Sequence, residues 1–333
     1  MKRTASAVLL AALVVATGAV DAARPAAATS ATRWIAVPVA TLWVSPGSDR
    51  TVDRLTISAP ASVSAWIEAM TVAQKQWLVG RVETQALYGT VVTVTATSGA
   101  WSKVVVPSQP TPRDPRGYPG WVPSWQLTST RPAPAASVAV VTAPTAWVYR
   151  SGGLTPASRL MDVSYDTRLP VVAASAARVE VALLGGGHGF LRPRDVAVYP
   201  STARRSPTGR QVVAQARKFL GLQYLWGGTS GFGYDCSGFA YSVYHVLGRV
   251  IPRDAAPQST RGTAVGRASL APGDLVFFRD ASGVVVHVAI YLGSVDGVPS
   301  VIHAPNTGRA VTITPLSAWP ASSYAGARRY ALG

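Results

Sequence analysis

The sequence has few of the residues that form disulfides and metal sites. Its 333 residues include one cysteine and four histidines, so the chain cannot form an internal disulfide and has few soft ligands for zinc. It contains neither an H-E-x-x-H nor a C-x-x-C pattern. We therefore expect no metal and no cofactor. The single cysteine, Cys236, is an unpaired thiol and hence a candidate reactive group.

Acidic residues are also scarce. The chain has 31 Lys and Arg residues against 15 Asp and Glu residues, which gives a formal net charge of +16. The basic residues are scattered and form no block interleaved with aromatic residues, so we expect no nucleic-acid binding. An anionic cell-wall polymer is a candidate partner, and a generally basic, solvated surface explains the charge equally well.

Only one apolar run is long, and it lies near the start of the chain. Residues 5–20 follow Lys2 and Arg3 and precede a series of small residues, with no cysteine near the candidate cleavage sites. This pattern is typical of a secretory signal peptide, and the run is short for a spanning helix. We assign residues 1–28 to the signal. We expect a secreted or cell-wall-associated protein with no transmembrane segment in its mature chain.

Two β-rich segments follow the signal. Alternating or β-branched runs predict strands at 39–46, 90–97 and 101–107, and a helical piece at 62–78 interrupts them. After a Pro- and Ala-containing linker, the second segment weakly repeats the first: T-L-W-V-S at 41–45 resembles T-A-W-V-Y at 145–149. The repeat predicts two small all-β barrels. We place them at 31–128 and 137–200 and expect the second to be a degenerate copy.

The last segment, 206–333, has a different pattern. A helix predicted at 212–220 is followed by a glycine-rich loop and then by an amphipathic run that begins near Cys236. The strands predicted beyond it are at 274–278, 284–292, 300–304 and 310–314. This order predicts an α+β domain with an antiparallel sheet.

The position of Cys236 favours reactivity. A cysteine in the first turn of a helix lies against unpaired N–H groups and the positive end of the helix dipole, and both favour the thiolate. The alternative is a buried structural cysteine, which is the commonest fate of a lone one.

A reactive cysteine needs a base, and the histidines limit the choice. His287 lies within the strand predicted at 284–292, and His303 begins the next hairpin arm, so His303 can orient the imidazole of His287. A satisfied core histidine is the alternative for His287. His245 lies beyond the second turn of the helix led by Cys236, and we expect it to point elsewhere. His188 is expected to be a loop residue.

Four motifs in the last segment resemble the NlpC family of papain-like cell-wall endopeptidases. They are Y-L-W-G-G-T-S-G-F-G-Y-D-C-S-G-F (224–239), L-A-P-G-D-L-V-F-F (270–278), H-V-A-I-Y-L-G (287–293) and V-I-H-A-P (301–305). The resemblance implies a papain-like domain with Cys236 as nucleophile, His287 as general base and acid, and His303 as the orienting residue. It also implies that Tyr224 contributes to the oxyanion site.

A finer resemblance reaches the first β-rich segment. The stretches 81–89, 104–123 and 251–255 resemble the YkfC-like branch of the family, in which SH3-like domains precede the catalytic domain. That branch implies that three residues meet the free amine of an N-terminal L-Ala: Glu83, Tyr118 and Asp254. It also implies that Asp235, Ser237 and Ala255 line the neighbouring subsite. Without the resemblance, the carboxylates of Glu83 and Asp254 are equally well explained as members of surface ion pairs, and Tyr118 as a residue that packs in the barrel. Residues 48–80 match no pattern.

These observations predict a secreted, monomeric cysteine endopeptidase without a cofactor. It would cleave the γ-D-Glu to diamino-acid bond of peptidoglycan stem peptides with a free L-Ala terminus. Three alternatives stay open. One is a broader hydrolase of intact wall, targeted by its SH3-like domains. Another is a wall-binding protein with an inactive catalytic domain. The third is an acyltransferase or amidase with the same Cys–His chemistry.

Overall fold

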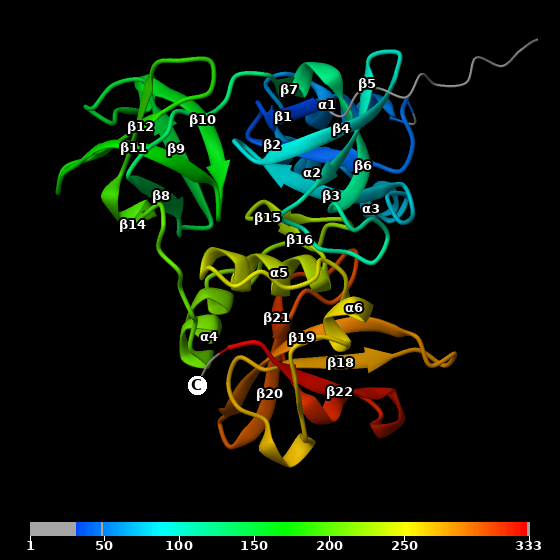
Figure 1. Cartoon of the computed structure of the whole chain (residues 1–333). Helices are drawn as coiled ribbons and strands as arrows, with labels where there is room; N and C mark the ends of the chain where they lie inside the picture. The colour runs from blue at the N-terminus through cyan, green and yellow to red at the C-terminus, as the bar shows by residue number, and fades with distance from the viewer. Residues whose placement is uncertain (1–30, 48, 332–333) are drawn as a thin grey trace, which may run out of the picture.

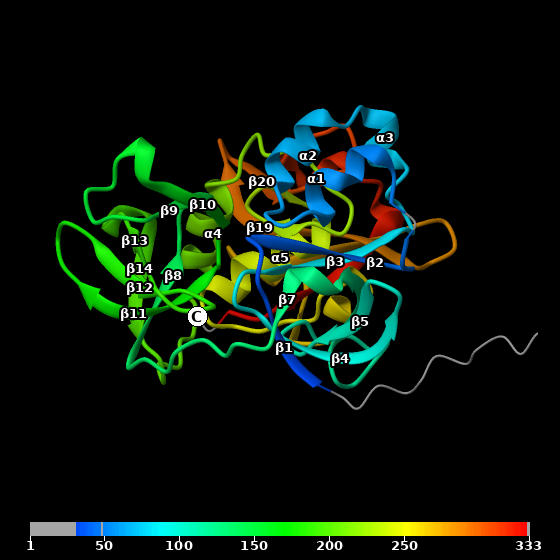
Figure 2. The ribbon, with the colours of Figure 1, turned by 90° about the horizontal axis from the view of Figure 1, so that it is seen from above.

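The structure, a computed structural model, describes residues 31–47 and 49–331 and has three lobes (Figure 1). Two β barrels stand beside one another on the helical side of a third lobe, which contains an antiparallel sheet; Figure 2 shows them from above. No helix in the described part of the chain is long and apolar enough to cross a membrane. The signal peptide expected at 1–28 lies outside the described residues.

The first barrel is a seven-stranded sheet with strand order β3-β2-β6-β5-β4-β1-β7. Its strands are β1 (Ala31–Ile35), β2 (Val39–Trp43), β3 (Val82–Leu87), β4 (Val91–Ser98), β5 (Trp101–Val106), β6 (Tyr118–Pro123) and β7 (Leu127–Thr128). Alternation explains why they form: in β4, Val92 and Val94 are buried while Val91 is exposed.

The second barrel repeats all seven strands of the first. Its strands are β8 (Ser137–Val141), β9 (Thr145–Tyr149), β10 (Arg159–Ser164), β11 (Arg168–Ala174), β12 (Val179–Ala182), β13 (His188–Leu191) and β14 (Val196–Pro200). Their order, β10-β9-β13-β12-β11-β8-β14, is the order of the first barrel shifted by seven. The sequence repeat falls on equivalent strands, β2 and β9. The second barrel, which we expected to be a degenerate copy, thus has the same strand order as the first.

The helical insertion of the first barrel is the main difference between the two barrels. It contains α1 (Arg54–Ile57), α2 (Val63–Ala69) and α3 (Val72–Gln76) in place of the single helix predicted at 62–78. The helix is interrupted because Thr71 starts a new one: its hydroxyl accepts from the Gln74 N–H, and the Gln74 side chain accepts from the Thr71 N–H.

The insertion packs beneath the glycine-rich loop of the third lobe. Trp66 and Ile67 of α2 share a hydrophobic cluster with Leu225, Trp226 and Phe232 from that loop. The indole N–H of Trp226 also donates to the carbonyl of Val82 at 3.0 Å. The segment that matched no sequence pattern therefore supports the chain just before Cys236.

The third lobe contains the α+β domain expected from the sequence. Its helices are α4 (Gly209–Arg217), α5 (Cys236–Val246) and α6 (Ala255–Ser259). Its strands are β15 (Thr229–Ser230), β16 (Gly233–Tyr234), β17 (Thr263–Val265), β18 (Leu275–Arg279), β19 (Val285–Val295), β20 (Val298–His303), β21 (Thr312–Pro315) and β22 (Tyr324–Arg329). The large sheet has the order β17-β22-β18-β19-β20-β21, and each of its pairings is antiparallel.

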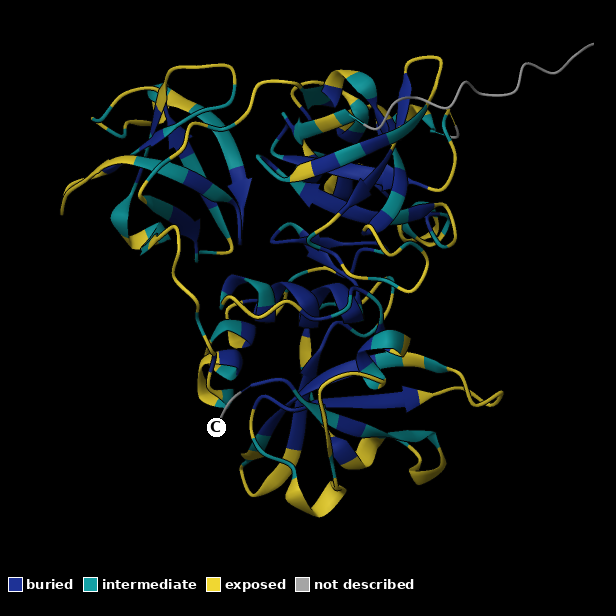
Figure 3. Cartoon of the chain, in the orientation of Figure 1, coloured by how far each residue is buried: buried dark blue, intermediate teal, exposed yellow. Residues whose placement is uncertain are grey.

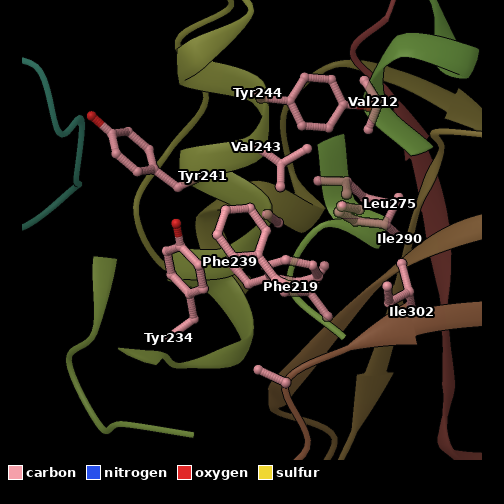
Figure 4. Packing of buried hydrophobic residues seen from close by; sticks show 14 of the residues in the cluster. Val212, Phe219, Tyr234, Phe239, Tyr241, Val243, Tyr244, Leu275, Ile290 and Ile302 are labelled. Atoms are coloured by element: carbon pink, nitrogen blue, oxygen red, sulfur yellow. The ribbon is translucent and has the colours of Figure 1, made fainter. Parts of the chain in front are cut away.

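Helix α5 is buried between the barrels and the sheet (Figure 3). Phe239 packs edge-on against Phe219 and at a tilt against Tyr234, and Figure 4 shows these rings together. Tyr241 points away from that cluster, and its hydroxyl donates to the carbonyl of Ser108 in the first barrel at 2.9 Å. The helix that begins with the cysteine is therefore held from both sides.

The second barrel holds the other end of α5. Asp166 is buried and pairs with both the His245 ring and the Arg168 guanidinium. Arg168 also donates to the carbonyl of His245 at 2.8 Å. His245 thus points away from Cys236, as expected, toward a barrel contact. His188 begins β13 and contacts Glu180 at 2.6 Å.

We expect the insertion to stabilise the catalytic lobe through Ile67, whose side chain is 5% exposed against the 225–233 loop. Ile67→Ala leaves a cavity there and should cost about 2–5 kcal/mol in the free energy of unfolding. Urea unfolding followed by tryptophan fluorescence measures this. Val72→Ala, at a side chain that is 59% exposed, is the control and should change the stability by less than about 0.5 kcal/mol. Equal effects of the two substitutions would show that the contact is not stabilising.

Candidate active site

Cys236 is the first residue of α5, as the sequence predicted. Asp235 is the N-cap, and its carboxylate accepts from the N–H of Gly238 at 2.7 Å. A side chain at Gly238 would lie 2.0 Å from the carbonyl oxygen of Gly228, so only glycine lets the loop approach the first turn this closely. The tight packing fixes the cysteine at the point where the loop meets the helix.

The environment of the thiol differs from the one expected. Backbone N–H groups of Val288 and Ser237 point to the sulfur, but burial raises the pKa of Cys236 to about 12, and the neighbouring Asp235 charge adds to this. Burial and a like charge thus outweigh the helix N-terminus. This direction of shift favours a neutral thiol in the ligand-free chain, so we expect its proton to leave when a substrate is attacked.

The two candidate histidines lie on neighbouring strands, His287 on β19 and His303 on β20. The contact with the Val288 N–H places Cys236 against β19, one residue beyond His287. His287 Nε2 is 2.8 Å from His303 Nδ1, and His303 Nε2 is 3.1 Å from the Thr314 hydroxyl. This pairing leaves His287 Nδ1 available. Burial lowers the pKa of His287 to about 4 and that of His303 to about 3, so both rings are neutral.

Trp319 covers the histidine pair, and the sequence analysis did not identify it. Its ring centroid is 5.0 Å from that of His303 and 6.4 Å from that of His287. It also stacks on Phe278 at 4.4 Å. The Trp319 ring thus packs against both imidazoles and restricts their orientation.

Tyr224 faces the cleft beside Cys236, where the resemblance places the oxyanion site. Its side chain is largely buried, and burial raises the pKa of its hydroxyl far above the usual value, with the Asp235 and Cys236 charges adding to this. The phenol therefore stays protonated and can donate a hydrogen bond. Its backbone N–H donates to the carbonyl of Arg309 at 2.9 Å, which fixes the segment.

Three residues implied by the resemblance meet at one end of the cleft. Glu83 and Tyr118 come from the first barrel, and Asp254 directly precedes α6 in the third lobe. The Tyr118 hydroxyl is 3.2 Å from Asp254 Oδ1. A fourth residue, Arg113, lies among them: its guanidinium forms a two-pronged ion pair with Glu83 and is 3.3 Å from the Tyr118 hydroxyl. The sequence analysis did not predict this arginine.

Asp235, Ser237 and Ala255 also line the cleft, but the Asp235 carboxylate is already engaged. Arg253, which is 1% exposed, donates to Asp235 Oδ2 at 2.6 Å, to the Ser237 hydroxyl at 3.0 Å and to the Thr84 hydroxyl of the first barrel at 3.0 Å. Asp235 is therefore a structural anchor. Arg253 lies in the quoted 251–255 stretch, yet nothing in its sequence context indicated this role.

The cleft itself has a volume of about 280 Å³. Its lining comes from both the first barrel and the third lobe and includes Val82, Glu83, Tyr118, Tyr224, Trp226, Asp235, Cys236, Ser237, Asp254 and Ala255. The volume is near the lower end of ligand pockets, roughly 300 Å³. A cleft of this volume suits a small ligand.

A cysteine at a helix N-terminus, opposite a histidine on an antiparallel sheet, defines a papain-like cysteine peptidase. Residues 221–329 match the NlpC/P60 family, and residues 141–199 match the YKFC SH3b2 domain. The chain is 41% identical over 309 residues to a gamma-D-glutamyl-L-lysine dipeptidyl-peptidase of Bacillus cereus, covering 89% of this chain and 90% of that protein. It is 36% identical to the protein of the same name from Bacillus subtilis, covering 84% and 92%.

A solved structure gives the same result. The crystal structure of an NlpC/P60 family protein from Bacillus cereus superimposes with a TM-score of 0.83 at 40% identity and covers 91% of this chain and 100% of that chain. The chain therefore belongs to the NlpC/P60 family of cysteine peptidases. The architecture expected from the sequence, a papain-like domain preceded by SH3-like barrels, is confirmed.

The raised pKa of Cys236 has a measurable consequence because it is the chain's only cysteine. We expect its alkylation by iodoacetamide to keep accelerating between pH 7 and pH 10, since the thiolate fraction grows about tenfold per pH unit below the pKa. Mass spectrometry gives the rate. The protein unfolded in urea is the control, and its rate should level off above about pH 8.5. A plateau of the alkylation rate below that pH in the folded protein would show that the helix N-terminus lowers the pKa of Cys236 more than burial raises it.

Proposed function

We propose that the chain is an extracytoplasmic cysteine endopeptidase that hydrolyses the γ-D-Glu to diamino-acid bond of peptidoglycan stem peptides with a free N-terminal L-Ala. The observation that carries the proposal is the meeting of Glu83, Tyr118 and Asp254 at one end of the cleft that contains Cys236. The names of the two Bacillus relatives support the bond type. The signal-like residues 1–28 support the location.

The closed end of the cleft suits a primary ammonium group. An ammonium taken out of water needs charged or polar acceptors around it. Burial raises the pKa of Asp254, and its polar neighbours are the Tyr118 hydroxyl at 3.2 Å and a buried Arg253 nitrogen at 3.8 Å. A bound ammonium would stabilise the ionised carboxylate of Asp254. Glu83 supplies a second negative charge from the opposite wall.

The residues that line the cleft suggest which bond reacts. With the L-Ala amine at Glu83, Tyr118 and Asp254, the γ-D-Glu residue follows at Ser237 and Ala255, and its γ-carbonyl reaches Cys236. The Cys236 sulfur forms a bond to this carbonyl carbon while its proton passes to His287 Nδ1. The oxyanion accepts from the Tyr224 hydroxyl and the Cys236 backbone N–H.

The neutral rings of the histidine pair suit both halves of the reaction. His287 gives the proton to the leaving amine as the C–N bond breaks, which leaves L-Ala-γ-D-Glu as a thioester on Cys236. Water then attacks the thioester and loses a proton to His287, which returns it to the sulfur. His303, held by Thr314, keeps His287 Nδ1 toward the thiol.

The first barrel limits the substrate. Its residues close the amine end of the cleft, so a stem peptide whose L-Ala is still linked to glycan has no space for the attached sugar. The protein would therefore trim wall fragments that an amidase has already released. Activity on intact sacculi equal to that on free peptide would contradict this limit.

The first test is mass spectrometry of L-Ala-γ-D-Glu-diaminopimelate incubated with residues 30–333. We expect release of L-Ala-D-Glu by the wild-type protein and none by Cys236→Ala. The N-acetylated peptide should be cleaved at least about tenfold more slowly, because acetylation removes the charge that the two carboxylates bind. Equal cleavage of the two peptides would support the peptidase activity but contradict an amine-specific site. Cleavage of intact wall but of neither peptide would favour the broader hydrolase.

Arg113 predicts a second, more specific effect. Its guanidinium is paired with the Glu83 carboxylate in the ligand-free chain. A substrate ammonium therefore has to compete for this carboxylate with the Arg113 side chain, which is 44% exposed. We expect Arg113→Gln to lower KM for the free-amine peptide by about fivefold, which is the equivalent of the roughly 1 kcal/mol of a partly exposed ion pair. The value of kcat should change little. Steady-state kinetics on the same peptide measures both.

The neighbouring Arg116 gives a matched control. It lies on the same loop and is paired with Asp114 at 2.7 Å, outside the cleft lining. Arg116→Gln should leave KM unchanged, and Glu83→Gln should raise it. An increase of KM in Arg113→Gln would show instead that the arginine holds Glu83 in its binding position.

A further inference from the structure

A second cavity lies next to the catalytic histidine pair and has no role in the site described so far. Its volume is about 840 Å³. It is lined by Leu220, Gly221, His303, Pro305, Asn306, Arg309, Ala310, Val311, Thr312, Thr314, Ala318 and Trp319. His303 and Trp319 therefore face this cavity as well as the His287 ring. A molecule bound there would lie against the machinery that protonates the leaving group.

The strand order places this cavity opposite the amine site. Helix α6, which carries Asp254 at its start, packs on β18, β19 and β22. The cavity is built by the ends of β20 and β21 and by the loop between them, on the other side of β19 in the sheet. If the acyl part of the substrate runs from Asp254 to Cys236, the part that leaves continues past His287 toward this cavity.

The loop that forms the cavity wall is fixed to the oxyanion segment. The Tyr224 N–H donates to the carbonyl of Arg309 at 2.9 Å, and Gln223 and Ala310 form an isolated β bridge. Within the loop, the Arg309 N–H donates to the carbonyl of Asn306 at 3.1 Å. The backbone of Arg309 therefore has a fixed position relative to Tyr224 and the reacting carbonyl.

The lining of this cavity carries charge of one sign only, and that charge is positive. Among the residues that line it, Arg309 carries the only charge, because His303 is neutral and no carboxylate is present. The Arg309 guanidinium also makes no ion pair with any other described residue. An unpaired guanidinium binds a carboxylate in a two-pronged geometry and repels an ammonium.

We propose that this cavity holds the diamino acid of the leaving peptide and that Arg309 binds the carboxylate on its distal carbon, so that diaminopimelate is preferred over lysine. The inference rests on the proposed function and specifies the leaving half of its substrate. A lysine side chain presents only an ammonium at that position and has no acceptor carboxylate in the cavity lining. The preference would distinguish this chain from what the names of its Bacillus relatives state, since those names specify lysine.

The test compares three tetrapeptides, L-Ala-γ-D-Glu-X-D-Ala, in which X is meso-diaminopimelate, its distal carboxamide or L-lysine. All three have the same backbone carboxylates, so only the distal group differs. We expect the wild-type kcat/KM for diaminopimelate to exceed that for the other two by about tenfold or more. Arg309→Gln should lower kcat/KM for diaminopimelate by about tenfold and change the other two by less than about twofold.

The controls separate this role from a general effect of charge. Arg210→Gln removes the same charge from an exposed position at the start of α4, outside the cavity, and should leave the preference unchanged. Arg309→Lys retains the positive charge without the two-pronged geometry, so it should show part of the diaminopimelate preference that Arg309→Gln loses. An equal loss for all three peptides in Arg309→Gln, or a wild-type enzyme without preference, would overturn the proposal.

Failure of the proposed function has a different outcome. Wild-type protein that cleaves none of the three peptides would contradict the peptidase assignment given above. Calorimetric binding of the same peptides to Cys236→Ala, with and without Arg309→Gln, then decides the role of Arg309 by itself. Tighter binding of the diaminopimelate peptide that is lost with Arg309 supports the site, and equal binding of all three peptides overturns it.

Discussion

The ion pair between Arg253 and Asp235 is the interaction on which the site depends. An isolated charge buried in a protein costs several kcal/mol, so a fully buried arginine has to be surrounded by acceptors. Arg253 satisfies this requirement with Asp235, Ser237 and the Thr84 hydroxyl, and its own N–H donates to the carbonyl of Pro110. The same carboxylate that neutralises Arg253 also caps the helix of Cys236. Nucleophile, helix and first barrel are therefore fixed by one buried charge.

The two barrels share one strand order but serve the catalytic lobe differently. The first supplies a wall of the cleft through Glu83 and Tyr118 and supports the glycine-rich loop with its helical insertion. The second contacts the far end of α5 through Asp166 and Arg168 and lines no part of the cleft in the described structure. The two barrels thus have the same topology but different roles, because the insertion and the 107–117 loop occur only in the first barrel.

Local patterns in the sequence predicted the features that depend on local physics. The helix that begins at Cys236, the strands that carry His287 and His303, and the two-barrel repeat each leave a signal in residue order and spacing. The resemblance added Glu83, Tyr118 and Asp254, whose proximity no spacing indicates. What the sequence did not show were long-range pairings: Arg113 with Glu83, Arg253 with Thr84, and the insertion beneath Trp226. The thiolate prediction failed for a similar reason, since the burial of Cys236 is a property of the assembled lobes.

The bond from Arg253 to Thr84 joins residues 169 positions apart. Long-range contacts of this kind are formed late, because the entropy of closing a large loop has to be overcome first. Until the first barrel has folded and docked, Arg253 lacks the hydroxyl of Thr84 as an acceptor. The apolar side chains of the glycine-rich loop, Leu225, Trp226 and Phe232, then also lack the surface on which they pack. The cleft is therefore complete only once the first barrel has docked on the third lobe, and any hydrolysis depends on that docking.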